Sequence, residues 1–312
     1  MRERIIIIGS NGQIGSELAI ALRDKHGKDS VITSDIKEPT TSTPGEIFEL
    51  IDVLNKDAVE QLFQKYQPTQ VYLLAAMLSA TGEKYPRLAW DLNMDGLFNV
   101  FDLSVQYKVS KVFWPSSIAV FGPNSPKHNT PQYTIMDPNT IYGISKLAGE
   151  RYCEYYYNRY GLDVRSIRYP GLISWKTAPG GGTTDYAIEI FHAARQSGAY
   201  ESFLSEDTAL PMLYMDDAIR GTIQLMEAPS DQIKQRSSYN LGGLSFNPEQ
   251  LGSAIRKHIP AFELQYTDHD PRQAIADSWP ASIDDTPARE DWGWEVKFDL
   301  DKMVEVMLNN IK

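Results

Sequence analysis

The chain has 312 residues and a net charge of −11, from 30 lysines and arginines against 41 aspartates and glutamates, which argues against a nucleic-acid or anionic-lipid partner. Its one cysteine excludes a disulfide framework, and its five scattered histidines lack the spacing of a zinc site, so we expect no metal. No apolar run reaches membrane length and no signal peptide precedes the first apolar run, so we expect a cytoplasmic protein.

The first apolar run, Ile5–Ile8, is typical of a strand that is buried on both faces. Gly9, Gly12 and Gly15 follow it, and residues 16–23 have the pattern of a helix. In a dinucleotide-binding turn the first glycine allows the tight turn, the second lets the backbone approach a pyrophosphate, and the third lets helix and strand pack closely. Free N–H groups at the helix start would bind the phosphates, although a turn without any ligand uses the same glycines.

A second apolar run, residues 31–34, ends at Asp35, which lies 20 residues after Gly15. A dinucleotide site needs an acid at about this distance to accept hydrogen bonds from the adenosine ribose. The same carboxylate would repel a 2′-phosphate, so the pattern predicts NAD rather than NADP. The alternative is that Asp35 only closes a strand at a turn.

The first half of the chain alternates short apolar runs with amphipathic segments. Further strands are predicted at residues 45–51, 70–76 and 109–115, and helices at 57–66 and 88–107. This alternation is typical of βαβ units, so we expect an α/β protein with a Rossmann-type, doubly wound parallel sheet. Ligands of such a sheet bind at the carboxyl ends of its strands.

The second half changes character and is rich in glycine, proline and threonine near its start. It predicts helices at 186–196 and 215–228, followed by short helices and loops. We therefore expect an NAD-binding domain over residues 1–169 and a smaller, partly interwoven substrate lobe over 170–312. Residues near 211–242 are expected to return to the first domain.

Tyr142 and Lys146 stand four residues apart at the start of a predicted helix, 142–160, so both should lie on one helix face. An ammonium and a positive nicotinamide ring near a phenol would lower its pKa from about 10 and make Tyr142 a general base near neutral pH. Lys146 would also hold the nicotinamide ribose. By itself such a pair arises often by chance.

Ser116 and Ser117 follow a predicted strand, and Ser117 lies 25 residues before Tyr142. Two hydroxyls at a strand end would contact the same substrate oxygen as the tyrosine, although serine is also common where strands simply stop. The combination of a glycine turn, a ribose-binding acid, a serine pair and a Tyr-x-x-x-Lys pair, in this order, makes chance an unlikely explanation of them all.

The order of the motifs resembles the extended short-chain dehydrogenase/reductase superfamily, in its UDP-galactose-4-epimerase-like branch. The resemblance spans nearly the whole chain and rests on Gly9-x-x-Gly12-x-x-Gly15, Asp35, Asp52-Val53, Leu74-Ala75-Ala76, Asn93, Ser116-Ser117, Tyr142-x-x-x-Lys146 and Arg168-Tyr169-Pro170-Gly171. Within that branch the stretches 78–83, 179–187, 210–218 and 272–294 are similar to L-threonine 3-dehydrogenases. The second and the last of these stretches are specific to that group, whereas Tyr-x-x-x-Lys is shared by the superfamily.

The resemblance implies that Tyr142 is the base, that Lys146 supports it and that Ser117 orients the reacting hydroxyl. Residues assigned to the cofactor, NAD, are Gly9, Asn11, Gly12, Gln13, Ile14, Gly15, Asp35, Ile36, Asp52, Val53, Leu74, Ala75, Ala76, Asn93, Tyr142, Lys146 and Tyr169. Residues assigned to the substrate are Ser79, Ser116, Ser117, Tyr142, Gly181, Thr183, Thr184 and Asp185. Asn93 is expected to support the lysine through water. Gln13 replaces the aromatic residue usual after the second glycine.

The glycine-threonine stretch suggests a substrate site on its own residues. We expect Thr183 or Thr184 to cap the helix that begins at Asp185. Free N–H groups and two hydroxyls would suit a small carboxylate, and Asp185 would meet an α-ammonium. The alternative is that Thr183 only caps the helix and Asp185 only offsets its dipole. The loop over 174–184 is expected to order over the substrate.

The predicted activity is therefore oxidation of the β-hydroxyl of L-threonine to 2-amino-3-oxobutanoate with NAD. A nucleotide-sugar 4-epimerase or dehydratase on the same fold is the nearest alternative. A non-enzymatic NAD-sensing protein would tend to lose the tyrosine or the lysine, and a zinc-dependent medium-chain dehydrogenase would need ligands that this chain lacks. The helices at 88–107 and 142–160 match those that pair in superfamily dimers, and the second is crowded with tyrosines, so we expect a homodimer.

Overall fold

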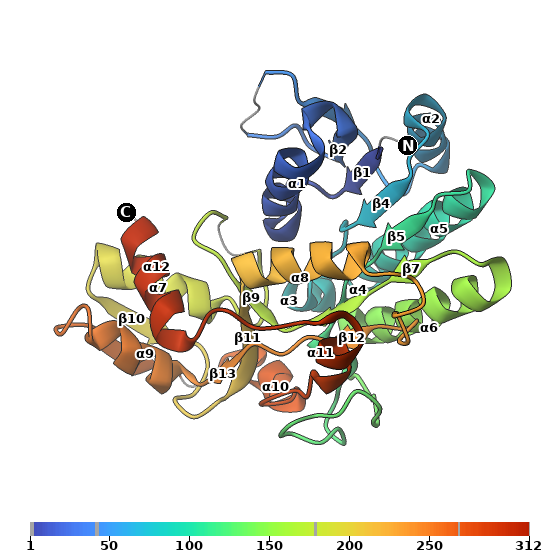
Figure 1. Ribbon diagram of the computed structural model, residues 1–312. Coiled ribbons are helices and arrows are strands. Elements are labelled where there is room, and N and C mark those ends of the chain that lie inside the picture. Colours follow the sequence, from blue (N-terminus) through green and yellow to red (C-terminus); the bar gives the residue numbers. More distant parts are fainter. Residues whose placement is uncertain (1–2, 41–43, 178–179, 268, 312) are drawn as a thin grey trace.

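A six-stranded parallel sheet organises the first half of the chain (Figure 1). The structure is a computed structural model that describes residues 3–40, 44–177, 180–267 and 269–311. The strand order of the sheet is β3-β2-β1-β4-β5-β7, and every neighbouring pair is parallel. The strands are β1 (Ile5–Ile8), β2 (Val31–Asp35), β3 (Ile47–Leu50), β4 (Gln70–Leu73), β5 (Lys111–Phe113) and β7 (Val164–Arg165). This doubly wound order confirms the fold class that the alternating sequence predicts.

Helices cover both faces of the sheet (Figure 1). The helical segments of this part are α1 (Gln13–His26), η1 (Lys28–Ser30), α2 (Lys56–Tyr66), α3 (Ser79–Lys84), α4 (Pro86–Trp90), η2 (Asp91–Asp95), α5 (Gly96–Gln106) and α6 (Ile141–Tyr160). The long helix expected at 88–107 is thus α4 and α5, joined by the π-helical turn η2. A helix-period pattern does not distinguish such a turn from α-helix.

The four isoleucines of β1 explain why both faces must be covered. Ile5 and Ile7 pack into the core beneath α1 and the later helix α8 (Met215–Glu227), whereas Ile6 and Ile8 pack beneath α2, α5 and α6. Each of the four is at most 1% exposed. Successive strand side chains point to opposite faces, so a run without polar residues is stable only between two helix layers.

The rest of the chain adds short strands and helices, of which some pack on the large sheet and the others build a second core. Its strands are β6 (Ser116–Ser117), β8 (Ile167–Tyr169), β9 (Gly171–Ile173), β10 (Ala199–Ser202), β11 (Leu210–Tyr214), β12 (Tyr239–Asn240), β13 (Leu244–Phe246) and β14 (Glu263–Tyr266). Its helical segments besides α8 are η3 (Ile118–Val120), α7 (Tyr186–Gln196), α9 (Pro248–Arg256), α10 (Pro271–Ser278), α11 (Thr286–Trp292) and α12 (Leu300–Asn310). The division between residues 169 and 170 stays a prediction. Among the described helices, none combines the length and apolar character needed to span a bilayer.

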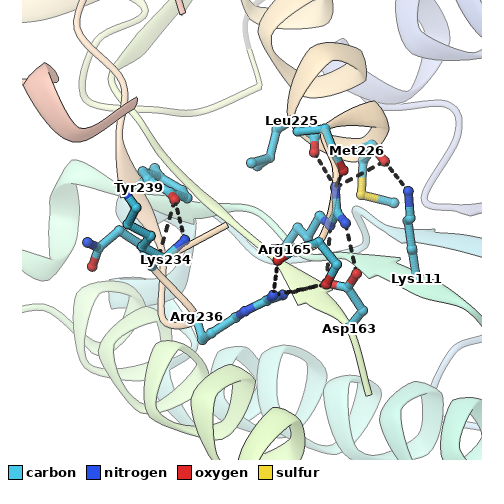
Figure 2. Close-up of polar contacts among 11 residues, drawn as sticks. Lys111, Asp163, Arg165, Leu225, Met226, Lys234, Arg236 and Tyr239 are labelled. Carbon is cyan, nitrogen blue, oxygen red and sulfur yellow. Dashed lines mark hydrogen bonds and ion pairs between the residues drawn. The ribbon is translucent and has the colours of Figure 1, made fainter. Parts of the chain in front are cut away.

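Helix α8 returns to the large sheet and is fixed there at its carboxyl end (Figure 2). The guanidinium of Arg165, on β7, donates to the carbonyls of Leu225, Met226 and Ala228, and Lys111 donates to the carbonyl of Met226 at 2.8 Å. These carbonyls have no partner within the helix, and two cations complement the negative end of its dipole.

Asp163 completes this anchor by binding the guanidinium of Arg165 at 2.8 Å and that of Arg236 at 2.6 Å (Figure 2). The two arginines hold the pKa of the Asp163 carboxyl below its usual value against the opposing effect of burial. The carboxylate therefore stays charged and compensates the buried guanidinium of Arg165.

Candidate active site

A cavity of about 490 Å³ lies at the carboxyl ends of the central strands, where a sheet of this kind binds its ligands. The glycine turn after β1, the loop after β4, the serines of β6, the start of α6 and the loop before α7 all line it. A larger open groove of about 810 Å³ between α1 and α8 contains none of the predicted site residues. The predicted site residues therefore identify the smaller cavity as the candidate active site.

The three glycines of the turn are needed for two different reasons. Gly9 has a left-handed φ of +88°, and an added Cβ would lie 2.5 Å from the Ala75 nitrogen. A Cβ on Gly15 would lie 2.7 Å from the Ser10 Cα, so this glycine allows α1 to pack on the turn. Gly12 is not crowded in this way, since its Cβ would make only an ordinary contact of 3.6 Å. Packing within the protein explains why Gly9 and Gly15 are glycines, whereas the absence of a side chain at Gly12 lets a ligand approach the backbone.

The turn also holds donors that fit the pyrophosphate of NAD. The buried Oγ of Ser10 and Nε2 of Gln13 have no hydrogen-bond partner among the described residues. The first turn of α1 has no side-chain cap, so its N–H groups are available as well. Unpaired buried donors are rare, and an anion at this position would satisfy them.

The adenosine end of the predicted site lies outside the cavity. The Oδ2 of Asp35 accepts a hydrogen bond from the Asn11 amide at 2.9 Å, which ties this acid to the glycine turn. Ile36 is 62% exposed, as a side chain that covers an adenine would be. Val53 is buried against Gly96, so only its backbone is available to the adenine. Among the described residues, those predicted for the site that do not line the cavity are Asn11, Asp35, Ile36, Asp52, Val53, Ala75, Asn93 and Gly181.

The two serines of β6 serve different partners because strand side chains alternate. The hydroxyl of Ser117 lies near enough to the phenol of Tyr142 to lower the pKa of that phenol, and it accepts a hydrogen bond from the Ala119 amide at 3.2 Å. The hydroxyl of Ser116 instead donates to the Glu150 carboxylate at 2.6 Å. Ser117 is therefore the serine that faces the phenol, whereas the Ser116 hydroxyl is engaged in the core.

Electrostatics at Tyr142 differ from the expectation. Burial raises the pKa of Tyr142 to about 12, and the hydrogen bond from Ser117 opposes this rise. Burial also lowers the pKa of Lys146 to about 7, with its Nζ 5.5 Å from the centre of the Tyr142 ring. The lowering of the phenol pKa expected from Lys146 is thus absent in the protein alone, because desolvation acts on both groups and disfavours both charges.

Asn93 lies in the π-helical turn η2 and joins three segments. Its Oδ1 accepts from the Met77 amide at 2.8 Å, and its Nδ2 donates to the Met77 carbonyl at 3.3 Å and to the Ser145 hydroxyl at 3.1 Å. These contacts fix the loop after β4 against the start of α6. The expected link from Asn93 to the lysine through water stays a prediction.

The loop before α7 corrects two expectations. The Oδ2 of Asp185 accepts from the amides of Gly181 and Gly182 at 2.8 and 2.7 Å, so these N–H groups are not free for a substrate carboxylate. Asp185 occupies the N-cap position of α7 without a side-chain capping hydrogen bond, so the expected cap by Thr183 or Thr184 is wrong. The physical reason is the left-handed φ of +89° at Gly181, which folds the loop back onto the carboxylate.

Threonine side chains of this loop nonetheless reach the cavity. The hydroxyl of Thr183 lies 3.3 Å from that of Ser79, and both residues are buried. Burial raises the pKa of Asp185, while the two glycine amides lower it. A hydroxyl pair and a buried carboxylate therefore line the same cavity as Tyr142. Residues 178 and 179 of the expected closing loop lie outside the described residues.

Comparison with known proteins agrees with this geometry. The model of the NAD dependent epimerase/dehydratase family matches residues 5–242. The chain belongs to this family. The membership confirms the branch predicted from the motifs, and with it NAD as the cofactor.

Several members of the branch align over nearly the full chain. A GalE-like L-threonine dehydrogenase from Cupriavidus necator, in its holo form, is 55% identical, with a TM-score of 0.96 over 99% of this chain and 100% of that chain. A monomeric L-threonine 3-dehydrogenase from a metagenome is 50% identical, with a TM-score of 0.95 over 98% of both chains. A protein of Staphylococcus haemolyticus described as an uncharacterized epimerase/dehydratase is 48% identical over 99% of this chain and 98% of its own.

The stretch over residues 272–294, which resembles L-threonine 3-dehydrogenases, has mostly structural contacts in this epimerase/dehydratase family member. Its Asp285 is buried and accepts from the Trp294 indole at 2.8 Å and the Gly242 amide at 3.1 Å. One residue of the stretch, Trp279, is buried and lines the cavity at the end of α10, a position that the sequence reasoning did not assign to the site. Tyr169, assigned to the cofactor, lines the cavity but directs its hydroxyl to Thr222 on α8, so only the rest of the residue is available there.

Proposed function

We propose that this protein is an NAD-dependent L-threonine 3-dehydrogenase, which oxidises the β-hydroxyl of L-threonine to 2-amino-3-oxobutanoate. The observation that carries the proposal is the placement of Ser117 and Tyr142 in one cavity, which the loop before α7 also lines. The relatives described as L-threonine dehydrogenases, at 44–55% identity over nearly the full chain, support the same assignment.

The proton of the substrate hydroxyl goes to the phenolate of Tyr142. Ser117 donates to the same substrate oxygen and orients it, since both side chains line the cavity and the serine lies near the phenol. NAD, when bound, supplies the acceptor for the hydride of the β-carbon and a positive ring that favours the phenolate. Because burial raises the pKa of Tyr142 to about 12 in the protein alone, this base is weakly ionised at neutral pH.

Lys146 and the glycine turn hold the cofactor in this proposal. The Nζ of Lys146 donates to the Pro115 carbonyl at 2.6 Å, which leaves two N–H bonds for the nicotinamide ribose. The unpaired donors of Ser10 and Gln13 serve the pyrophosphate. Asp35, held by the Asn11 amide, accepts from the adenosine ribose and disfavours a 2′-phosphate.

The amino-acid end of the substrate lies against the loop before α7. Ser79 and Thr183 offer hydroxyls to the carboxylate, and Asp185 offers its buried carboxylate to the α-ammonium. The positive charge of the ammonium would oppose the effect of burial, which raises the pKa of Asp185. Thr184, Ser116 and Gly181 remain predicted contacts.

One assay separates this proposal from the epimerase or dehydratase alternative that the family name carries. The purified protein is incubated with NAD and either L-threonine or a UDP-sugar, and absorbance is followed at the NADH band. The proposal predicts net NADH with threonine and none with the sugar. Sugar turnover without NADH, and no reaction with threonine, would establish the alternative.

For the assembly we propose a homodimer formed by α4, α5 and α6. Exposed apolar side chains gather on these helices and the turn before α4, among them Tyr85, Leu88, Ile144, Tyr152 and Tyr155. Aromatic side chains are enriched at protein interfaces. The metagenome relative is described as monomeric, so the oligomeric state of this protein has to be decided by a mass measurement. Light scattering at micromolar concentration should give twice the chain mass of 35.2 kDa, and the mass of one chain would refute the dimer.

A further inference from the structure

Lys146 is a buried cation without an acidic partner. It is 2% exposed, and within the described parts of the chain no carboxylate lies at ion-pair distance from its Nζ. Glu150, one turn further along α6, is bound to Arg168 at 2.8 Å and to Ser116. An ammonium removed from water is normally costly unless another group compensates its charge.

The face of Trp114 provides such compensation. The Nζ of Lys146 lies 4.4 Å from the centre of the Trp114 ring, and the indole is itself buried directly after β5. The negative face of an indole attracts a cation at this distance, most strongly when water is excluded. The Pro115 carbonyl, at 2.6 Å, is the other electron-rich group that contacts the ammonium.

The packing of α6 keeps the lysine over this ring. Gly149 stands three residues after Lys146 on the same helix face, and an added Cβ there would lie 2.5 Å from Trp114 Cζ2. The absence of a side chain at this position allows the helix to approach the indole. The glycine and the tryptophan therefore form one structural unit beneath the lysine.

We propose that Trp114 is a positioning residue, whose indole face holds the Lys146 ammonium charged and directed toward Tyr142 and the cofactor ribose. The proposal rests on the function proposed above, because that function needs a charged lysine. Burial lowers the pKa of Lys146 to about 7, so its charge near neutral pH is sensitive to a lost contact. The motifs of the superfamily do not include this tryptophan.

Few other ionisable groups surround the lysine. Tyr142, Glu150 and Cys153 lie on its own helix, and burial raises the pKa of the Cys153 thiol, which stays neutral. From the packed strands, Trp114 and Pro115 contribute a ring and a carbonyl, and Arg168 of β8 reaches the Glu150 carboxylate. We therefore assign any change in the pH profile of a Trp114 variant to the ionisation of Lys146 and Tyr142.

The test compares Trp114→Leu, which keeps an apolar side chain without a ring, with Trp114→Phe, which keeps an aromatic face. Leucine should lower kcat/KM about tenfold at neutral pH and shift the limbs of its pH profile, while phenylalanine stays closer to the native protein. The profile shifts because the lysine loses its proton at lower pH and the phenol then ionises at higher pH, so less of the enzyme carries both charges. Equal losses in both variants, or an unchanged profile in the leucine variant, would overturn the proposal.

Two further measurements keep the outcome decisive. If the leucine variant does not fold, fluorinated tryptophan at position 114 replaces it, because fluorine keeps the shape of the ring and weakens the negative potential of its face. The value of kcat/KM should then fall with each added fluorine. Calorimetry of NAD binding as a function of pH needs no turnover. As the pH rises, the leucine variant should lose its affinity for NAD at a lower pH than the native protein, because its Lys146 loses the proton earlier. An identical midpoint overturns the role of Trp114. Absence of threonine oxidation in the native protein would refute only the proposed function.

Discussion

Glu17, on the cofactor helix α1, binds Lys176, which lies in the segment that leads to the substrate loop, with 2.8 Å between Oε2 and Nζ. The same carboxylate accepts from the Ser174 hydroxyl, and Ser16 lies 3.4 Å from the Thr177 hydroxyl. The first turns of the helix that would hold the pyrophosphate are therefore joined to the segment that would hold threonine. Neither partner belongs to a sequence motif.

Lys176→Met should loosen that connection. We expect the KM for threonine to rise about fivefold, or about 1 kcal/mol, because Lys176 is 39% exposed and solvent screens part of the pair. The dissociation constant of NAD should change less, since the glycine turn is untouched. Steady-state kinetics and calorimetry measure the two quantities. Lys25→Met removes an exposed pair between α1 and α8 and serves as the control.

Tyr142→Phe removes the proposed base and leaves the ring. We expect kcat to fall at least about a hundredfold, the low end for a positioned general base, while NAD affinity is kept. Single-turnover kinetics and NAD titration check the two parts. Turnover near the native rate would show that another group takes the proton.

Ser117→Ala should shift the pH dependence of kcat/KM. The hydrogen bond from Ser117 lowers the pKa of Tyr142, so its loss raises that pKa and moves the acid limb of the profile to higher pH. The base works only when deprotonated, so the rate loss should be largest at neutral pH and smaller toward alkaline pH. Ser116→Ala is the matched control, since Ser116 donates to Glu150, and its profile should keep the native midpoint. A loss that is independent of pH would contradict this assignment.

Arg165→Met tests the anchor of α8. The carbonyls of Leu225 and Ala228 lose their side-chain donor and Asp163 loses one of its two arginines, so we expect the free energy of unfolding to fall by about 3 kcal/mol. Lys111→Met removes a single carbonyl contact and should cost about 1 kcal/mol. Urea unfolding measures both values. Equal, small losses would mean that the helix end is satisfied by water.

The fold and the centre of the site were predictable because their signals are local. Alternating apolar runs indicated the sheet, and the glycines, Asp35, Ser117 and Tyr142 each stand at a strand end or a helix start, where chain order alone brings them to one edge. Asn11 and Asp35 meet at the glycine turn for the same reason, since Asn11 follows β1 and Asp35 ends the neighbouring strand β2.

What could not be predicted depends on contacts between distant segments. Trp279 reaches the cavity from the last helices, Glu17 meets Lys176 across the two lobes, and Trp114 contacts Lys146 only because Gly149 lets α6 approach. The expected cap of α7 is absent because the glycine loop turns the Asp185 carboxylate toward its own amides and the Thr183 hydroxyl toward Ser79, contacts that no local pattern reveals.

The most direct test of the central claim follows the hydrogen on the β-carbon. The native protein is given NAD and L-threonine deuterated at C3, and the NADH formed is analysed by mass spectrometry. The account predicts that each NADH carries the deuterium and that Tyr142→Phe forms almost none in the same time. NADH without deuterium, or no NADH at all with threonine in excess, would contradict the account.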